Sequence, residues 1–299
     1  MGESSWLGGR LTGLAAAGQP AWAVGDLGMG SWRWDGAAWH PVPLADLSSY
    51  NVDLTGIAAP SEQAAWAVGR LWVGGQLTAL ALHWDGQAWQ RTPLAGPLAT
   101  TTSLRAVAAA QEAATAVGSA GDTALAWRWD GRAWQAETIA PPTFAGFSAV
   151  AHSALTSVAV LARDNAWAVG AAPGGALVVH WSDGAWHLVP LATPADTTLF
   201  GIAAAGPNDL WTVGASGNGT APVPFVAQWT GAAWTPEHLD LPDGAPFGLL
   251  YSVTAVAPDD VWAAGSYQGA DGDRLLLAHW DGRRWTTQAG PAPPPLATP

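Results

Sequence analysis

The chain has no cysteine and no lysine, and these two absences narrow what it can do. Without cysteine it can form no disulfide and no thiolate metal site. Only 11% of its 299 residues are charged, the formal net charge is -12, and arginine supplies every one of the 11 basic side chains. Nucleic acids and anionic membranes are bound through clustered basic side chains. The composition therefore argues against either of them as the main partner.

The sequence also lacks the segments that would enter a membrane. No apolar run reaches the length of a transmembrane helix. The first thirty residues contain Glu3, Arg10 and Asp26 and no continuous apolar core, so no signal peptide is predicted. We therefore expect no membrane insertion. The chain could be cytoplasmic or the mature part of an exported protein, and its oligomeric state is left open.

Tryptophan, by contrast, is abundant, with 21 copies, and many of them form a repeated pair. In the first copy, Trp34 and Trp39 flank a turn that contains Asp35 and Gly36. Asp-Gly between apolar runs favours a tight β-hairpin, because both residues tolerate positive φ angles. The pair recurs about every 50 residues, as expected of a repeat protein. The copies are Trp34/Trp39, Trp84/Trp89, Trp129/Trp134, Trp181/Trp186, Trp229/Trp234 and Trp280/Trp285.

A second repeated segment precedes each hairpin and ends in glycine. Its first copy reads Ala-Trp-Ala-Val-Gly at 21–25, and only Thr115 replaces its tryptophan in a later copy. A further strand, rich in small residues, lies upstream of each copy. Four short strands per repeat predict an all-β fold, a six-bladed β-propeller of four-stranded antiparallel blades. The glycine-ended segments are 21–25, 65–69, 114–118, 166–170, 210–214 and 261–265.

The repeat sets the expected domain organisation. We expect residues 1–290 to form one propeller domain, and residues 291–299, which are rich in proline and alanine, to form a tail or linker. The predicted repeats span residues 11–43, 54–94, 104–139, 155–191, 199–240 and 251–288.

The repeat resembles two known kinds of bacterial propeller repeat. The Ala-Trp-Ala-Val-Gly strand is similar to the apolar, glycine-ended strand of kelch repeats, although it ends in a single glycine where kelch repeats have a pair. The turn with Asp35, Gly36 and Trp39 resembles the Asp-box of sialidase-type propellers, one residue short. The resemblance implies a kelch-like or Asp-box-like propeller. Such families include lectins, scaffolds, oxidases and glycosidases, so it implies no single function.

The hairpins are uniformly short, whereas the connections at the opposite edge of each blade vary in length. Variable loops on a fixed scaffold are where binding residues concentrate, so we expect the binding face there. Off-pattern aromatic residues fall in or beside these loops and would either pack the loops or line a binding surface. The candidate ligand-binding residues are Trp72, Tyr50, Phe247, Tyr251, Tyr267 and Arg105. Arg105 shares its place in the first strand with Thr12, Thr55, Thr156, Phe200 and Ser252 of the other repeats.

The sequence contains less evidence for catalysis than for binding. His83, His180 and His279 each precede a hairpin tryptophan in a different repeat, which favours a packing role. Asp271 and Asp273 could together hold Ca²⁺, but the rest of a calcium loop is missing. No catalytic group, metal or cofactor is otherwise predicted. We therefore expect a non-catalytic binding or scaffold propeller that contacts a protein or glycan, with lectin-like recognition as its specific form. The alternative is a glycoside hydrolase or lyase with acidic residues at the axial mouth.

Overall fold

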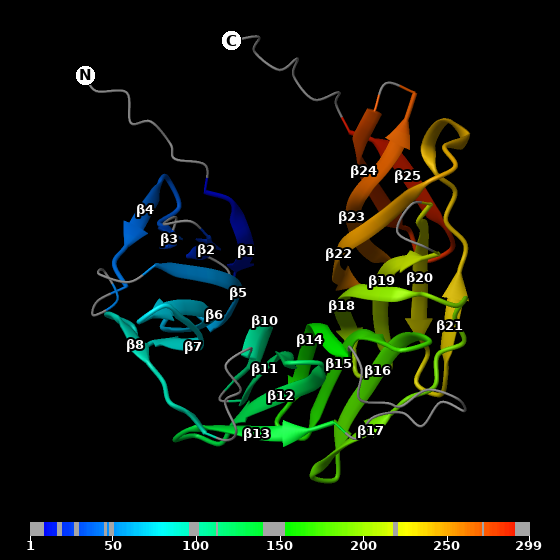
Figure 1. Cartoon of the computed structure of the whole chain (residues 1–299). Helices are drawn as coiled ribbons and strands as arrows, with labels where there is room; N and C mark the ends of the chain where they lie inside the picture. Colours follow the sequence, from blue (N-terminus) through cyan, green and yellow to red (C-terminus); the bar gives the residue numbers. More distant parts are fainter. Residues whose placement is uncertain are drawn as a thin grey trace, which may run out of the picture. The chain divides into compact units, whose positions relative to one another are not determined.

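The computed structural model describes residues 9–16, 20–26, 30–44, 47, 51–95, 102–111, 113–139, 153–217, 221–270 and 272–290. Within them the chain forms six consecutive antiparallel sheets, each with its four strands in chain order (Figure 1). In blade three an additional strand, β9, pairs in parallel with β13. The chain is therefore all-β, and its six sheets are the blades of a six-bladed β-propeller, as the sequence predicts.

The strands are short, and each blade is formed by consecutive strands. Blade one has β1 (Leu11–Ala16), β2 (Ala21–Gly25), β3 (Gly30–Trp34) and β4 (Trp39–Val42), and blade two has β5 (Val52–Ser61), β6 (Ala64–Val73), β7 (Gln76–Trp84) and β8 (Trp89–Arg91). Blade three has β9 (Leu94–Ala95), β10 (Thr102–Ala110), β11 (Ala113–Ala120), β12 (Thr123–Trp129) and β13 (Trp134–Thr138). Blade four has β14 (Ala154–Ala162), β15 (Asn165–Ala172), β16 (Gly175–Ser182) and β17 (Ala185–Leu188). Blade five has β18 (Thr198–Gly206), β19 (Asp209–Ser216), β20 (Val223–Trp229) and β21 (Trp234–Glu237), and the short 3-10 helix η2 (Pro242–Gly244) follows it. Blade six has β22 (Gly248–Ala257), β23 (Asp260–Gly269), β24 (Gly272–Trp280) and β25 (Trp285–Ala289).

The chain divides into two compact units, and the division falls within blade four. The first unit contains blades one to three and part of blade four. The second contains the remainder of blade four with blades five and six. In the first unit the first strands of neighbouring blades lie side by side, β1 against β5 and β5 against β10. In the second unit β18 lies against β22 in the same way.

A β-bulge near the start of the first strand explains the glycine that ends the second strand. In blade five the register shifts between Leu199 and Gly201, so that Phe200 is the extra residue, and Leu199 lies opposite Gly214. A Cβ atom on Gly214 would lie 2.0 Å from the carbonyl oxygen of Thr198. Side chains cannot approach backbone so closely, so the bulge requires glycine here. The same close approach occurs at Gly69, Gly118 and Gly265.

The tryptophan columns pack neighbouring blades together. Trp22 of β2 lies with its ring 5.0 Å from Trp84 and 5.1 Å from Trp89, the hairpin pair of blade two. Each such tryptophan buries a large apolar surface, so the column is the main source of inter-blade stability. The same arrangement recurs for Trp66 with Trp129 and Trp134, for Trp167 with Trp229 and Trp234, and for Trp211 with Trp280 and Trp285.

The histidines that precede hairpin tryptophans pack on the tryptophan of the second strand in the same blade. His83 packs on Trp66 in a tilted arrangement with ring centroids 4.2 Å apart, and His180 stacks on Trp167 at 4.1 Å. His279 stacks in the same way on Trp262 at 4.2 Å. Each histidine is the cross-strand neighbour of its tryptophan, as the register shows for blades two and six. The packing role that the sequence predicts for these histidines is confirmed.

Blade three replaces its column tryptophan by the buried Thr115, and an arginine supplies the missing contact. Arg128, the cross-strand partner of Thr115, places its guanidinium 3.8 Å from the ring centre of Trp181. It also donates a hydrogen bond to the carbonyl oxygen of Arg163 at 2.6 Å. A cation over an indole ring is an attractive contact, strengthened here by partial burial. The contact of Arg128 with Trp181 therefore replaces the packing that a tryptophan in place of Thr115 would provide.

The hairpin aspartates hold the tight turns closed. Asp35 accepts hydrogen bonds from the backbone N–H groups of Ala37 and Ala38, both at 2.8 Å. These bonds, with a smaller contribution from His40, lower the pKa of Asp35 from 3.8 to about 2. The corresponding backbone bonds lower the pKa values of three further hairpin aspartates, Asp85, Asp130 and Asp281.

We expect these turns to make the fold sensitive to acid. A carboxylate whose pKa is lowered by folding contributes stability that is present above its unfolded pKa and is lost as the pH falls through its folded pKa. Unfolding in urea should therefore require progressively less denaturant as the pH is lowered from about 4 to about 2. The Asp35→Asn variant, which cannot titrate, should show a shallower decline. A midpoint that stays constant over this range would contradict the role assigned to the turns.

Candidate functional site

An arginine and an aspartate form an ion pair where blade one begins. Arg10 precedes β1 and Asp26 follows β2, and their side chains meet at 2.9 Å. The backbone N–H of Arg10 also donates to the Asp26 carboxylate at 2.8 Å, and the backbone N–H of Asp26 donates to the carbonyl oxygen of Arg10 at 3.0 Å. The Asp26 side chain is only 12% exposed, whereas that of Arg10 is 79% exposed. The carboxylate is therefore held in place from several sides.

Blade two carries an ion pair at the equivalent place with the two charges exchanged. Asp53 of β5 lies opposite Arg70 of β6 in the strand register, and their side chains meet at 3.2 Å. Asp53 directly precedes the leucine of the bulge, as Arg10 does in blade one, and Arg70 directly follows the glycine, as Asp26 does. Since β2 and β5 are in contact, the two pairs lie on neighbouring blades. We call Arg10, Asp26, Asp53 and Arg70 the ion-pair edge.

Asp26 is kept ionised by its surroundings. The backbone N–H of Arg10 makes the largest contribution to lowering its pKa, and the Arg10 guanidinium adds to the effect, while burial opposes it. Hydrogen bonds to the charged form of a carboxylate favour that form. Asp26 can therefore act as a proton acceptor or as a fixed negative charge, but it is unsuited to donating a proton at neutral pH.

The ion-pair edge lies on the face that the sequence predicts to be functional, but sequence reasoning did not select its residues. It is formed where first strands begin and second strands end, which is the edge with variable connections. The signal was available in the repeat alignment. An arginine and an aspartate occupy both flanking positions in blades one and two, whereas blade three has Ser103 and Ser119 there. Small or polar residues flanking the bulge in most repeats made the charged exceptions easy to overlook.

The predicted ligand-binding residues differ in exposure. Trp72, Phe247 and Tyr251 are 46%, 37% and 56% exposed. Tyr267 is 1% exposed and belongs to the core of blade six, where it lies opposite Gly248, so its ring is not accessible for stacking on a ligand. Tyr50 lies outside the described residues.

The bulges decide which side chains share the column of Arg105. In blade six the register shifts between Leu250 and Ser252, so Tyr251, and not Ser252, is the residue equivalent to Phe200 and Arg105. The predicted column was therefore one residue out of register in this blade, because the sixth repeat was taken to begin at Tyr251, whereas Leu250 lies opposite Gly265 as Leu199 lies opposite Gly214. Tyr251 and Phe200 lie with ring centroids 5.8 Å apart. Arg105 is exposed on β10.

No metal site is found in the part of the chain that the structure describes. No group of three or more histidine, aspartate or glutamate side chains comes close enough there to hold an ion. Of the two residues considered for Ca²⁺, Asp273 is exposed and Asp271 lies outside the described residues. Likewise, the described residues contain no helix long and apolar enough to span a membrane.

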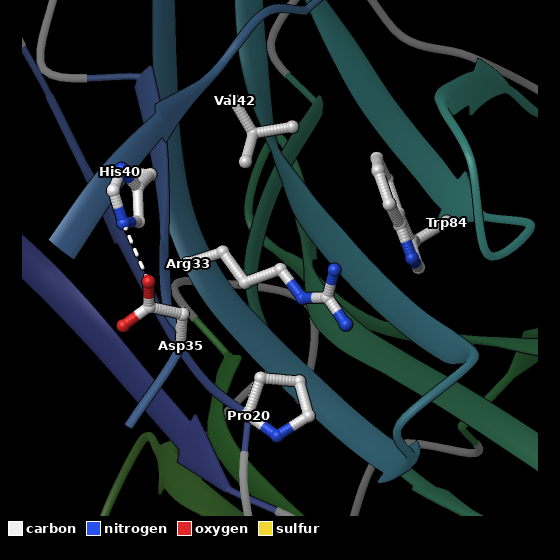
Figure 2. Close-up of a pocket in the computed structure, with 6 residues that line it drawn as sticks. All are labelled: Pro20, Arg33, Asp35, His40, Val42 and Trp84. Atoms are coloured by element: carbon white, nitrogen blue, oxygen red, sulfur yellow. Dashed lines mark hydrogen bonds and ion pairs between the residues drawn. The ribbon is translucent and has the colours of Figure 1, made fainter. Parts of the chain in front are cut away.

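A cavity of about 510 Å³ lies at the opposite, hairpin edge of blades one and two (Figure 2). Arg33 of β3 extends into it, with the Asp35 carboxylate and the His40 ring to one side. His40 contacts Asp35 at 2.8 Å, shown by the dashed line in Figure 2. The remaining lining residues are Pro20, Val42 and Trp84. Sequence reasoning assigned no function to this edge, because its hairpins are uniformly short.

Comparison with known proteins supports the fold and does not settle the family. No protein-family model and no curated protein sequence matches the chain, so the kelch-like or Asp-box-like resemblance is not confirmed. Among solved structures, the chain is similar to YCF48 bound to D1 peptide, with 19% identity, a TM-score of 0.59, and coverage of 93% of this chain and 80% of that one.

Two of the similar structures are enzymes that act on polysaccharides. A GH74 xyloglucanase from Xanthomonas campestris shares 17% identity at a TM-score of 0.62, and the match covers 94% of this chain but 45% of the enzyme. A PL25 ulvan lyase bound to -[GlcA(1-4)Rha3S]- shares 8% identity at a TM-score of 0.58, covering 92% of this chain and 81% of the lyase.

These comparisons contradict the expectation of a non-catalytic binding or scaffold propeller. The fold is shared with catalytic propellers as well as with a peptide-binding one, and the comparisons favour the alternative of a glycoside hydrolase or lyase. The expectation was wrong because it took the absence of a recognisable catalytic motif in the sequence as evidence against chemistry. In repeat propellers a site is assembled from different blades. What is shown for this chain is the fold itself, a six-bladed β-propeller.

Proposed function

We propose that this chain degrades a polysaccharide, as a glycoside hydrolase or a lyase, and that Asp26 and Asp53 of the ion-pair edge are its reacting carboxylates. The observation that carries the proposal is the pair of nearly buried carboxylates, each held by an arginine, on neighbouring blades. Glycosidic bonds are commonly cleaved by two carboxyl groups fixed on either side of the scissile bond. Buried carboxylates with bound arginines cost stability unless they are well compensated, which favours a functional reason for them.

The surroundings of the two carboxylates suggest their roles. Asp26, held ionised by Arg10, would be the carboxylate that takes a proton from water in hydrolysis or from a uronic acid carbon in elimination. In hydrolysis Asp53 would supply the second carboxyl group of the pair. In elimination the exposed guanidinium of Arg10 would face the carboxylate of the uronic acid and stabilise the developing negative charge.

An exposed tryptophan beside the ion-pair edge provides a surface for a sugar. Trp72 lies two residues after Arg70 on β6, so both side chains leave the strand on the same face. Its backbone N–H is fixed by the carbonyl oxygen of Asn51 at 3.1 Å, and its side chain is 46% exposed. A half-exposed indole next to charged groups can stack on a sugar ring while those groups bind its hydroxyls.

The solved structures support the same substrate class. One neighbour is a xyloglucanase, and another is a lyase bound to a glucuronate-containing glycan. Both are enzymes that cleave glycans on a propeller fold. Their low identity transfers no residue and no substrate to this chain. The finer resemblance to kelch-like or Asp-box-like repeats is compatible with this activity, since such propellers include glycosidases.

Incubation with a panel of polysaccharides tests the proposal. Xyloglucan represents neutral substrates and ulvan represents uronate-containing ones. Hydrolysis would release reducing ends alone, whereas elimination would also produce an unsaturated uronate detected by its ultraviolet absorbance. Replacing a group that transfers protons typically costs 100-fold or more, so Asp26→Asn and Asp53→Asn should each lower the rate by about 100-fold or more.

A matched control is available on the opposite edge of blade two. Glu62 is an exposed carboxylate in the turn between β5 and β6, so Glu62→Gln should leave the rate unchanged. Thermal unfolding of all three variants separates lost chemistry from lost folding. If the wild-type chain cleaves a polysaccharide and Asp26→Asn and Asp53→Asn, still folded, cleave it equally fast, the site assignment is wrong. If no polysaccharide in a broad panel is cleaved, the function is wrong.

A further inference from the structure

Arg33 occupies a column in which blades five and six supply the equivalent side chain with a carboxylate. In blade five the equivalent residue is Gln228, which donates a hydrogen bond to the Asp209 carboxylate at 2.9 Å. In blade six it is His279, which contacts the Asp260 carboxylate at 3.0 Å. Asp209 and Asp260 both stand two residues before the tryptophan of the second strand. In blade one that position is Pro20, as it is Ala64 in blade two and Ala113 in blade three, and none of these has a side-chain acceptor.

The Arg33 guanidinium therefore faces a cavity without the carboxylate found in blades five and six. Its Nε atom is buried and has no hydrogen-bond partner among the described residues. Two indole rings lie near the guanidinium, with their centres 5.6 Å away for Trp22 and 6.0 Å away for Trp84. Leaving a buried donor without an acceptor is unfavourable, and more so for a charged group. An anion that entered the cavity would give the guanidinium a charged partner.

The contact between Asp35 and His40 is not by itself a sign of function. In blade two Gln90 donates to Asp85 at 3.3 Å in the same way, and in blade three Gln135 donates to Asp130 at 3.1 Å. This contact is a feature of the hairpin. The missing acceptor opposite Arg33 is instead a departure from blades five and six, and it coincides with a cavity.

The lining of the cavity indicates the chemistry of its ligand. Arg33 provides one cation for one carboxylate of a ligand. The Asp35 carboxylate does not fill this role, because its partners are His40 and two backbone N–H groups. The exposed oxygen and nitrogen atoms of Asp35 and His40 can bind hydroxyl groups. Pro20, Val42 and Trp84 provide apolar surface, and Figure 2 shows Pro20 and Trp84 on either side of the guanidinium. A volume of about 510 Å³ is within the range of small-ligand sites.

We infer that the Arg33 cavity binds a hexuronate residue, with the sugar carboxylate on the Arg33 guanidinium in the place that Asp209 and Asp260 occupy in their blades. A hexuronate combines one carboxylate, several hydroxyl groups and apolar C–H faces, which is the combination that the lining offers. The site lies at the opposite edge of the blades from the ion-pair edge. It would hold a uronate-containing chain without cleaving it, so this inference goes beyond the proposed function and does not depend on turnover.

Two substitutions test the inference on the full chain. Pro20→Asp restores the carboxylate of blades five and six and should pair with Arg33, so that it excludes the ligand while keeping the fold. Arg33→Gln introduces the residue that blade five uses and removes the charge. Binding of sodium glucuronate, followed by calorimetry or by tryptophan fluorescence, should weaken by about tenfold or more in each variant, since a charge-assisted pair of hydrogen bonds is lost.

Matched ligands and a matched variant make the outcome decisive. Glucose, which lacks the carboxylate, and acetate, which lacks the sugar, should both bind at least about tenfold more weakly than glucuronate. His83→Gln, in the same column of blade two, should leave glucuronate affinity unchanged. The inference is overturned if Arg33→Gln binds glucuronate as tightly as the wild type, if glucose binds equally well, or if acetate does. The result does not depend on whether any polysaccharide is cleaved, so it can fail or succeed separately from the proposed enzymatic activity.

Discussion

Replacement of Gly214 by alanine is expected to prevent blade five from forming. The new Cβ would lie 2.0 Å from the carbonyl oxygen of Thr198 and 2.8 Å from the Cα of Leu199. Both are backbone atoms in a strand that is hydrogen-bonded to its neighbour and includes the bulge, so neither can move aside without breaking the register. Losses of stability above about 4 kcal/mol are exceptional for a single substitution, and a backbone clash of this kind belongs among them.

Gly206, in the same blade, provides the control. A Cβ atom there would meet nothing within 4 Å, and its φ is not positive. Gly206→Ala should therefore leave stability unchanged or raise it slightly, because it restricts the unfolded chain. Urea unfolding followed by tryptophan fluorescence would compare the two variants with the wild type. Equal stabilities for Gly214→Ala and Gly206→Ala would contradict the bulge as the reason for the glycine column.

The second large effect is expected when a column tryptophan is removed. Trp66 is 4% exposed and lies between His83 and the tryptophan pair of blade three, with ring centroids 4.9 Å from Trp129 and 5.1 Å from Trp134. Trp66→Ala should lower the free energy of unfolding by about 3 to 5 kcal/mol, the range for large aromatic side chains removed from a core. The loss combines the apolar surface exposed with the cavity left between two blades.

Another tryptophan on the same strand allows a close comparison. Trp72 follows Trp66 on β6 but is 46% exposed, so Trp72→Ala should cost less than about 1 kcal/mol. Chemical denaturation of both variants measures the difference directly. A similar loss for both would mean that inter-blade packing is not what the column tryptophans provide. The same Trp72→Ala protein should show weakened binding of a polysaccharide substrate, since its ring is proposed to stack on a sugar.

The repeat pattern allowed the blades to be predicted, because local signals determine them. Trp34, Trp39 and the Asp-Gly turn between them predict a hairpin from neighbouring residues alone. The column positions of His83, His180 and His279 indicated packing before the structure showed them stacked on tryptophans. The glycine column was recognised, but its reason, a bulge on the facing strand, was not.

The functional residues were harder to predict because their proximity depends on contacts between strands. Asp26 and Asp53 lie far apart in the sequence, and each meets its arginine only through the pairing of a first strand with a second. Tyr267 was selected for its position near a variable loop, but strand register turns it into the core. The absence of a side-chain acceptor at Pro20 is noticed only when the equivalent contacts in blades five and six are known.

By itself, the sequence determined the architecture of this protein: six blades, their hairpins and the tryptophan columns between them, all of which follow from short-range spacing repeated about every 50 residues. Only the tertiary structure decided which charged side chains pair, which aromatic rings are exposed, and where a cavity remains. The physical reason is that a strand alternates its side chains with a period of two, so one bulge or one changed partner moves a residue between core and surface without altering the repeat.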